Sequence, residues 1–382
     1  MIAADLTFPS TAVACQDCGA LQSVPDRAPP PRAACFRCGA RLVCAGGRAG
    51  RAGRAGRAGR ASNDRRDHAQ AFTLAAIPLF AVANLSPLLQ MEGAGEITRV
   101  TLVGAARALW EQGLPALAVL VLLTTIALPA LQLLATTTLL FWPRRRTAPA
   151  LLARVIQVIR PWAHIDILLL GILVAFGKLA TLFQVTPGIG LGGLVGFLAL
   201  ERLALACQRA PAPPAPRRAR DSLAGSGAFL IAAAILFVPA NLLPVMTTRT
   251  LLRAHSDTIL SGVVALWRAG SWPLSALVFV ASIVVPALKI LALAVLTVST
   301  HARLAWRRGE RARLYRLIEA IGRWSMLDIF VMALLAALVR SQVAGVEIHT
   351  GALAFAAVVV LTMLSSISFD PRLIWAREKG QP

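Results

Sequence analysis

Residues 80–87 read Phe-Ala-Val-Ala-Asn-Leu-Ser-Pro, and residues 237–244 read Phe-Val-Pro-Ala-Asn-Leu-Leu-Pro, 157 positions further along the chain. Each motif closes a long uncharged stretch. Proline lacks a backbone N–H and disfavours helix at the residue before it, so a helix should kink or end at each motif. The amides of Asn84 and Asn241 can satisfy the backbone groups that this frees. The motif is then either a helix terminator with its cap or an opening that lines a polar cavity.

The same spacing relates other residues of the two halves and predicts an internal repeat. The matched residues at a shift of 157 are Asn84 with Asn241, Pro87 with Pro244, Trp110 with Trp267, Gly113 with Gly270, and Gln132 with Lys289. At a shift of 162, Trp162, Asp166 and Lys178 match Trp324, Asp328 and Arg340. Because Asn, Pro, Trp, Asp and a cation all keep register, chance similarity between apolar sequences is a poor explanation.

The composition indicates a membrane protein. Of 382 residues, 57% are hydrophobic and only 15% are charged, whereas soluble domains have about 25% charged residues. The net charge is +21, but the basic residues stand in short blocks between long uncharged runs instead of along one face. This pattern favours membrane topology signals over nucleic-acid binding, and the apolar content excludes disorder over most of the chain.

Eight stretches are apolar enough to cross a bilayer, which takes about 20 residues of helix. They are Ala69–Met91, Pro115–Trp142, Ile165–Gln184, Leu191–Leu200, Ser222–Thr248, Pro273–Thr300, Trp324–Arg340 and Gly351–Ser368. We therefore expect an all-α polytopic membrane protein, with eight transmembrane helices arranged as two parallel four-helix repeats. No signal peptide is predicted at the N-terminus.

Every second loop is basic, which predicts that both termini are cytoplasmic. The clusters lie before residue 69, at 144–160, at 209–220, at 303–316 and at 372–379. On the opposite side, the stretches 98–111 and 258–268 have apolar residues at helical spacing. We expect them to be short helices at the outer boundary, anchored by Trp110 and Trp267.

Several charged or polar residues fall inside the predicted spans, where an unpaired charge costs at least about 2.5–3.5 kcal/mol. Lys289 lies near the middle of its span and is expected to pair with Asp328. In the first half, Gln132, Asp166 and His164 occupy the corresponding places. The pair is either a packing device or part of ion or proton coupling. Lys178 and Arg340 lie late in their spans and are expected to reach the outer interface.

Four cysteines form two Cys-x-x-Cys-Gly knuckles, Cys15 with Cys18 and Cys35 with Cys38, separated by sixteen residues. This spacing is typical of a four-thiolate zinc site, in which four protein ligands leave no open position and make the metal structural. Iron takes the same ligands and is the alternative. Disulfides are disfavoured on the cytoplasmic side.

These features divide the chain into six segments. They are a zinc-ribbon-like module at 12–45, a flexible basic Gly/Arg/Ala tether at 46–68, the first membrane repeat at 69–205, a cytoplasmic linker at 206–221, the second repeat at 222–370, and a cytoplasmic tail at 371–382.

The knuckles, the repeated Asn-Leu-x-Pro, the Trp-x-x-Gly element and the closing Ser368-Phe-Asp-Pro-Arg-Leu-Ile-Trp375 together resemble the paraquat-inducible protein A family. The resemblance covers about residues 12 to 376. Family members commonly carry a second cysteine module before the second repeat, and this chain lacks it. In the first half, Glu201-Arg202 stands roughly where the family's Asp-Pro-Arg is expected.

The resemblance implies a non-enzymatic, multi-pass protein of the bacterial inner membrane. Its partner would be a periplasmic mammalian-cell-entry (MCE) domain protein, and together they would move phospholipid between the inner and outer membranes. The intramembrane polar residues would belong to the lipid-handling or coupling machinery. Two other functions stay open on the residues alone: a redox membrane protein that uses the four cysteines, and a secondary transporter of small molecules or ions. The sequence contains no P-loop, which argues against direct ATP hydrolysis.

Overall fold

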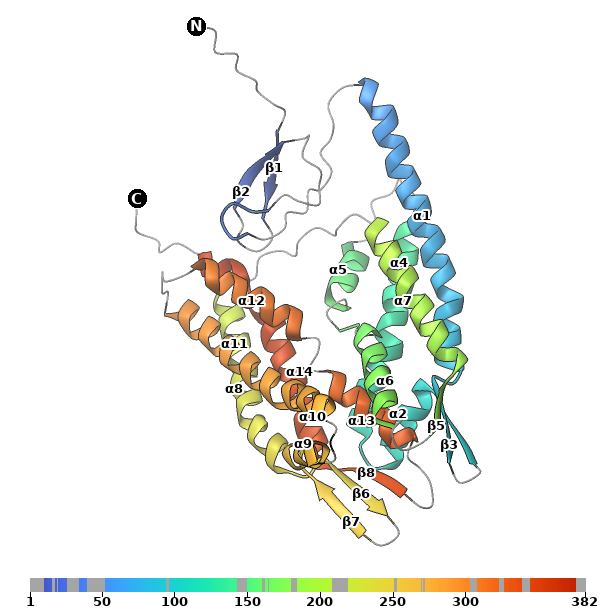
Figure 1. Cartoon of the computed structure of the whole chain (residues 1–382). Helices are drawn as coiled ribbons and strands as arrows, with labels where there is room; N and C mark the ends of the chain where they lie inside the picture. The colour runs from blue at the N-terminus through green and yellow to red at the C-terminus, as the bar shows by residue number, and fades with distance from the viewer. Residues whose placement is uncertain are drawn as a thin grey trace.

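The computed structural model describes residues 10–15, 18, 20–25, 34–39, 52–93, 96–142, 150–159, 162–163, 165–179, 184–207, 219–250, 253–268, 270, 272–302, 308–322, 326–338 and 344–375. Most of these residues are helical. A small two-stranded sheet lies at one end of the helices, called here the head end (Figure 1). Two three-stranded sheets lie at the opposite end, called the sheet end.

The first half begins with a long helix that leads into a β-hairpin and ends with a helix that returns along the first. Its elements are α1 (Ala52–Leu85), β3 (Leu89–Gly93), β4 (Glu96–Val100), α2 (Leu102–Glu111), α3 (Pro115–Leu122), α4 (Leu128–Phe141), α5 (Ala150–Ile159), α6 (Ile165–Leu179), β5 (Gln184–Pro187) and α7 (Ile189–Cys207). α1 packs along α7.

The second half has the same order of elements. They are α8 (Ala219–Leu242), β6 (Met246–Thr250), β7 (Arg253–Asp257), α9 (Ile259–Arg268), α10 (Trp272–Phe279), α11 (Val285–His301), α12 (Arg308–Gly322), α13 (Leu327–Leu338), β8 (Ala344–Ile348) and α14 (Thr350–Ser368). α8 packs along α14, as α1 does along α7. Each half also has a three-stranded antiparallel sheet in which its first strand is central, in the orders β4-β3-β5 and β7-β6-β8.

The strands correct the all-α expectation. Residues 89–91 and 246–248, which the apolar pattern assigned to spans, belong to β3 and β6 instead. The physical reason is the Asn-Leu-x-Pro motif, since α1 ends at Leu85 and α8 at Leu242, before the proline in both cases. Released from the helix, the following residues satisfy their backbone groups in a sheet.

The asparagines of the motif bond the backbone of their own helix one turn back. Asn84 Nδ2 donates to the carbonyl oxygen of Phe80 at 2.6 Å, and Asn241 Nδ2 donates to that of Phe237 at 2.8 Å. These are not the carbonyls of residues 83 and 240, from which the prolines withhold an N–H, but both bonds lie in the last turns before the helix ends. This is the terminator function of the motif.

The backbone carbonyls of the two prolines accept hydrogen bonds from the first turns of the returning helices, α7 and α14. The carbonyl oxygen of Pro87 accepts the N–H of Gly190 at 3.0 Å, and that of Pro244 accepts the N–H of Gly351 at 3.2 Å. A Cβ on either glycine would lie 2.5 Å from a backbone oxygen of the motif. The close approach therefore requires glycine at the start of α7 and α14.

Trp-x-x-Gly is the end of a short helix in both halves. The predicted stretches 98–111 and 258–268 contain the helices α2 and α9, although residues 98–100 belong to strand β4. Gly113 and Gly270 follow them with φ of +80°, a conformation that favours glycine. Trp110 and Trp267 are more than half exposed, as interface anchors would be.

Among the described residues, six helices are long and apolar enough to cross a membrane, against the eight that were predicted. They are Asp64–Leu85, Pro115–Phe141, Ile189–Cys207, Asp221–Leu242, Ser275–His301 and Thr350–Ser368. The stretches expected to supply the other two, 165–184 and 324–340, contain α6 of 15 residues and α13 of 12 residues. α6 and α13 pack against each other between the two halves, where Gly171 faces Phe330.

Two of the long helices contain a π-helical turn at matching positions, Leu123–Ala127 and Val280–Val284. Each turn is followed by a proline, Pro129 or Pro286, that cannot donate to the helix behind it. Thr124 and Thr125 in the first turn bond their hydroxyls to carbonyls three or four residues earlier. The wider turn accommodates the missing N–H without ending the helix.

Two predicted boundaries are wrong. α1 begins at Ala52, so residues 52–68 of the predicted flexible tether are helical. Alanine and arginine have high helix propensity, and the helix extends from the apolar segment that follows. The fourth span, predicted at Leu191–Leu200, is the 19-residue helix α7, which continues through the charged Glu201 and Arg202 because both have partners.

Candidate metal centre and intramembrane polar pairs

The four predicted cysteine ligands converge. β1 (Ser10–Ala14) and β2 (Leu21–Pro25) form an antiparallel hairpin, and Cys15 and Cys18 lie between the strands. Cys35 and Cys38 lie in a second turn. All four side chains are buried, and their sulfur atoms lie within 4.8 Å of one another.

The spacing of the sulfurs fits a tetrahedral metal. Cys15 Sγ lies 3.6 Å from Cys38 Sγ, and Cys18 Sγ lies 3.5 Å from Cys35 Sγ. Four thiolates at about 2.3 Å from zinc would be separated by about 3.8 Å. The four cysteines can therefore hold one metal ion with no open coordination position.

Backbone donors shape the protonation of the cluster. Burial raises the pKa of Cys18. Burial also raises the pKa of Cys35, but hydrogen bonds from the backbone N–H groups of Cys38 and Arg37, together with those from the thiols of Cys18 and Cys15, outweigh it, and the pKa of Cys35 falls to about 7. The N–H of Gly39 bonds the carbonyl of Cys35 at 2.8 Å and closes this knuckle.

The cluster is seated on the second half of the chain. Arg316 of α12 donates from Nη2 to the carbonyl oxygen of Cys38 at 3.0 Å, and Ala312 of α12 is buried against the sulfurs. Trp375 also packs against the cluster. The guanidinium carbon of Arg37 lies over the Trp375 ring, 4.8 Å from the ring centroid. Trp375 ends a 3-10 helix, Pro371–Trp375, so this part of the predicted tail is structured.

The first intramembrane pair joins α4 to α7. Gln132, which is buried, donates from Nε2 to Glu201 Oε1 at 2.7 Å. Its other amide atom, Oε1, is buried and has no hydrogen-bond partner among the described residues. A neutral amide bonded to a carboxylate is a strong, charge-assisted hydrogen bond.

The second pair joins α6 to α7. Arg202 Nη2 lies 2.8 Å from Asp166 Oδ2, and both side chains are partly exposed. Asp166 also accepts the backbone N–H of Ile167 through Oδ1 at 3.2 Å, in the first turn of α6. Adjacent residues of α7 thus bond Gln132 and Asp166, and His164, the third polar residue predicted in this half, lies outside the described residues.

The sequence did not reveal that Glu201 and Arg202 are the partners of Gln132 and Asp166. They were interpreted as a degraded closing motif after the fourth span. The signal that could have found them is the placement of an acidic and a basic residue inside the apolar stretch 189–207, opposite Gln132 and Asp166, which are themselves polar residues in apolar surroundings.

Lys289 is buried in α11, as expected for a charge near the middle of a span. Only 4% of its surface is exposed, and no described residue forms a hydrogen bond with Nζ. A Cβ on Gly322, the last residue of α12, would lie 3.2 Å from Nζ. The ammonium group therefore reaches the end of α12, where helix carbonyls lack partners.

Three predicted residues cannot be placed at atomic level. Asp328 is the second residue of α13 and Lys178 belongs to α6, but their side chains lie outside the described residues, as does Arg340 altogether. The predicted pairing of Lys289 with Asp328 therefore stays a prediction.

Comparison with known proteins gives one consistent result. The chain matches the family described as "Paraquat-inducible protein A" twice, over residues 67–210 and 223–379. It is 32% identical over 421 residues to the "Intermembrane transport protein PqiA" of Escherichia coli strain K12, covering 96% of each chain. It is also 32% identical over 267 residues to the "Lipophilic envelope-spanning tunnel protein A" of the same organism, covering 59% of this chain and 62% of the relative. No solved structure gives a significant match.

Proposed function

The chain belongs to the paraquat-inducible protein A family, and we propose on this basis that it is the inner-membrane component of a system that carries lipid between the two membranes of a Gram-negative envelope. The observation that carries the proposal is the near full-length similarity to a protein named for intermembrane transport. The relative named as a lipophilic tunnel protein supports lipid as the cargo. The partner would be a periplasmic MCE-domain protein.

We propose that the membrane part is two parallel repeats of four crossing helices, in which α6 and α13 are the third crossing of each half. The matching order of elements, the paired π-helical turns and the two family matches support a repeat. In this arrangement the head end and both termini are cytoplasmic, and the two three-stranded sheets face the periplasm. A periplasmic partner would then dock on these two sheets.

We propose that Cys15, Cys18, Cys35 and Cys38 hold structural zinc in a ribbon-like module. The support is the closed set of four converging thiolates, which leaves no place for a substrate. Metal analysis of the purified chain tests this: one zinc per chain is expected, whereas stoichiometric iron would favour the redox alternative.

The function is tested by co-purification and transfer. The full chain, purified from its host membrane, should bring an MCE-domain protein and phospholipid with it. In paired vesicles that contain both proteins, fluorescent phospholipid should move between populations. Recovery of neither partner nor lipid, together with uptake of a small solute by the chain alone, would favour a secondary transporter instead.

Replacing Asp166 and Asp328 together by Asn tests proton coupling. If the two carboxylates carry the proton, lipid transfer should be lost in this variant.

A further inference from the structure

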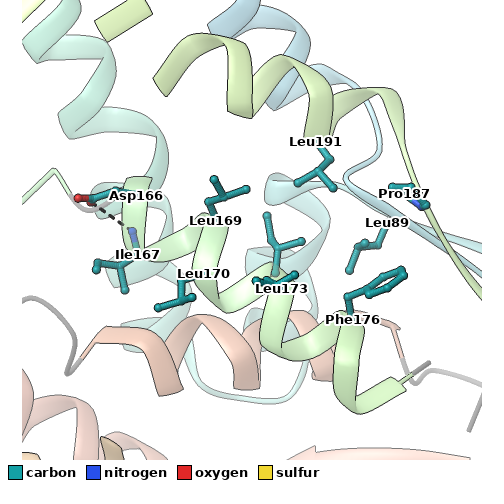
Figure 2. A pocket seen from close by; sticks show the side chains of 10 residues that line it. Leu89, Asp166, Ile167, Leu169, Leu170, Leu173, Phe176, Pro187 and Leu191 are labelled. Carbon is teal, nitrogen blue, oxygen red and sulfur yellow. Dashed lines mark hydrogen bonds between the residues drawn. The ribbon is translucent and has the colours of Figure 1, made fainter. Parts of the chain in front are cut away.

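An open cavity of about 720 Å³ runs along α6. Its lining is aliphatic or aromatic except for one carboxylate: Leu89, Asp166, Ile167, Leu169, Leu170, Ile172, Leu173, Phe176, Pro187 and Leu191. Figure 2 shows Asp166 at one end of this groove and Phe176, Leu89 and Pro187 at the other. The lining therefore changes from charged to wholly apolar along a single helix.

The length of the groove matches one leaflet. Asp166 and Phe176 are ten residues apart in α6, which is about 15 Å at 1.5 Å rise per residue. This is half of the hydrocarbon thickness of about 30 Å and equals the depth that one acyl chain occupies. Leu173, in the middle of the groove, is 64% exposed, so the groove is accessible from the side.

At the charged end of the groove, Arg202 and Asp166 can both bind a lipid headgroup. Arg202 uses Nη2 on Asp166 Oδ2 at 2.8 Å, and its side chain is 56% exposed. A guanidinium has five N–H donors and binds phosphate in a two-pronged geometry. The side chain of Asp166 is 31% exposed and can accept from an ammonium group.

We propose that this groove binds one acyl chain of a phospholipid whose headgroup carries both phosphate and amine, with the phosphate on Arg202 and the ammonium on Asp166. The inference rests on the proposed lipid-transport function and gives that function a binding site and a headgroup class. A zwitterion fits because each of its charges replaces one partner of the existing ion pair, so no charge is left alone. A lipid with phosphate only would leave Asp166 without a cation inside the hydrocarbon, which is costly.

The test uses the full chain in detergent and two photoreactive probes with the same acyl chain, phosphatidylethanolamine and phosphatidylglycerol. Mass spectrometry of the crosslinked protein should place the amine probe on α6 or on β3 and β5. Replacing Leu173 by Trp should fill the groove and abolish the adduct, whereas Leu134→Trp, on the 63% exposed leucine of α4, should not. Leu173→Phe is the second variant if the Trp variant does not elute as a single species.

Headgroup recognition is tested on the ion pair. Arg202→Gln should lower labelling by the amine probe about tenfold, as expected for loss of a charge-assisted contact. Asp166→Asn should remove the preference for the amine probe over the phosphatidylglycerol probe. Equal labelling by the two probes in the unmodified chain, or labelling that Leu173→Trp leaves unchanged, would overturn the inference.

Vesicle transfer, measured on the same preparations, separates this inference from the proposed function. Normal transfer with no adduct on α6 overturns the groove and leaves the function standing. An adduct with the expected headgroup preference, but no transfer in the presence of the partner, supports the groove and overturns the function.

Discussion

Arg316 of α12 donates a hydrogen bond to the backbone carbonyl of Cys38, over 3.0 Å and 278 residues of sequence. The cysteine module precedes the first half of the chain but is seated on the second half. Trp375, in the closing motif, also contacts the module, because its ring lies under the guanidinium group of Arg37. The N-terminal module and the closing motif thus meet at one cysteine cluster.

Replacing Arg316 by Ala should loosen the module from α12. A hydrogen bond from a charged donor contributes about 1.5–3 kcal/mol, so amide hydrogen exchange in residues 34–39 should accelerate by about tenfold or more. Arg313→Ala is the matched control, because Arg313 is an exposed residue of the same helix. Equal exchange rates in the two variants would show that Arg316 does not hold the module.

Removing the metal should unfold the module and release it from its seat. Binding of a structural metal contributes directly to folding, so Cys38→Ser or treatment with a strong chelator should lower the midpoint of thermal unfolding and expose Trp375 to solvent. Trp375 fluorescence, isolated by replacing the other tryptophans, reports this. Cys207→Ser, at the end of α7, should change neither metal content nor fluorescence.

Gly190→Ala should destabilise the junction between α1 and α7. The added Cβ would lie 2.5 Å from the carbonyl oxygen of Ser86 and 2.9 Å from that of Pro87, and backbone atoms cannot move aside as a side chain can. Overpacking of this kind costs about 1–3 kcal/mol. Gly192→Ala, two residues further along α7, meets nothing within 4 Å and should be neutral or slightly stabilising. Similar denaturation midpoints for both variants would contradict the close-packed junction.

Much of this architecture could be predicted from the sequence, because local chemistry decides it. The Asn-Leu-x-Pro motifs that end at Pro87 and Pro244 end helices, glycines at 113 and 270 follow short helices, and two knuckles bring four thiols together. None of these features depends on which distant segment packs nearby.

The parts that could not be predicted depend on tertiary partners. β3 and β6 carry the last residues of two predicted apolar spans, and each pairs both with the next strand of its hairpin and with β5 or β8, which comes from far along the chain. Glu201 and Arg202 interrupt an apolar pattern, but α7 continues through them because Gln132 and Asp166 lie opposite. The periodicity of one helix does not reveal which polar residue of another helix will lie opposite it, because that depends on how the helices pack.

Lys289→Met separates a packing role from a functional one for the buried lysine of α11. Methionine has similar length and no charge, and replacing a buried charge by an apolar residue is often neutral or stabilising. We expect the thermal midpoint to stay level or rise, while lipid transfer with the partner protein falls by at least about tenfold, since the ammonium near Gly322 is then lost. Leu288→Met, at the exposed neighbouring position, should leave both measurements unchanged. Full transfer by the Lys289→Met protein would mean that the lysine only packs the helices, and a large drop in its thermal midpoint would mean that the charge stabilises the fold.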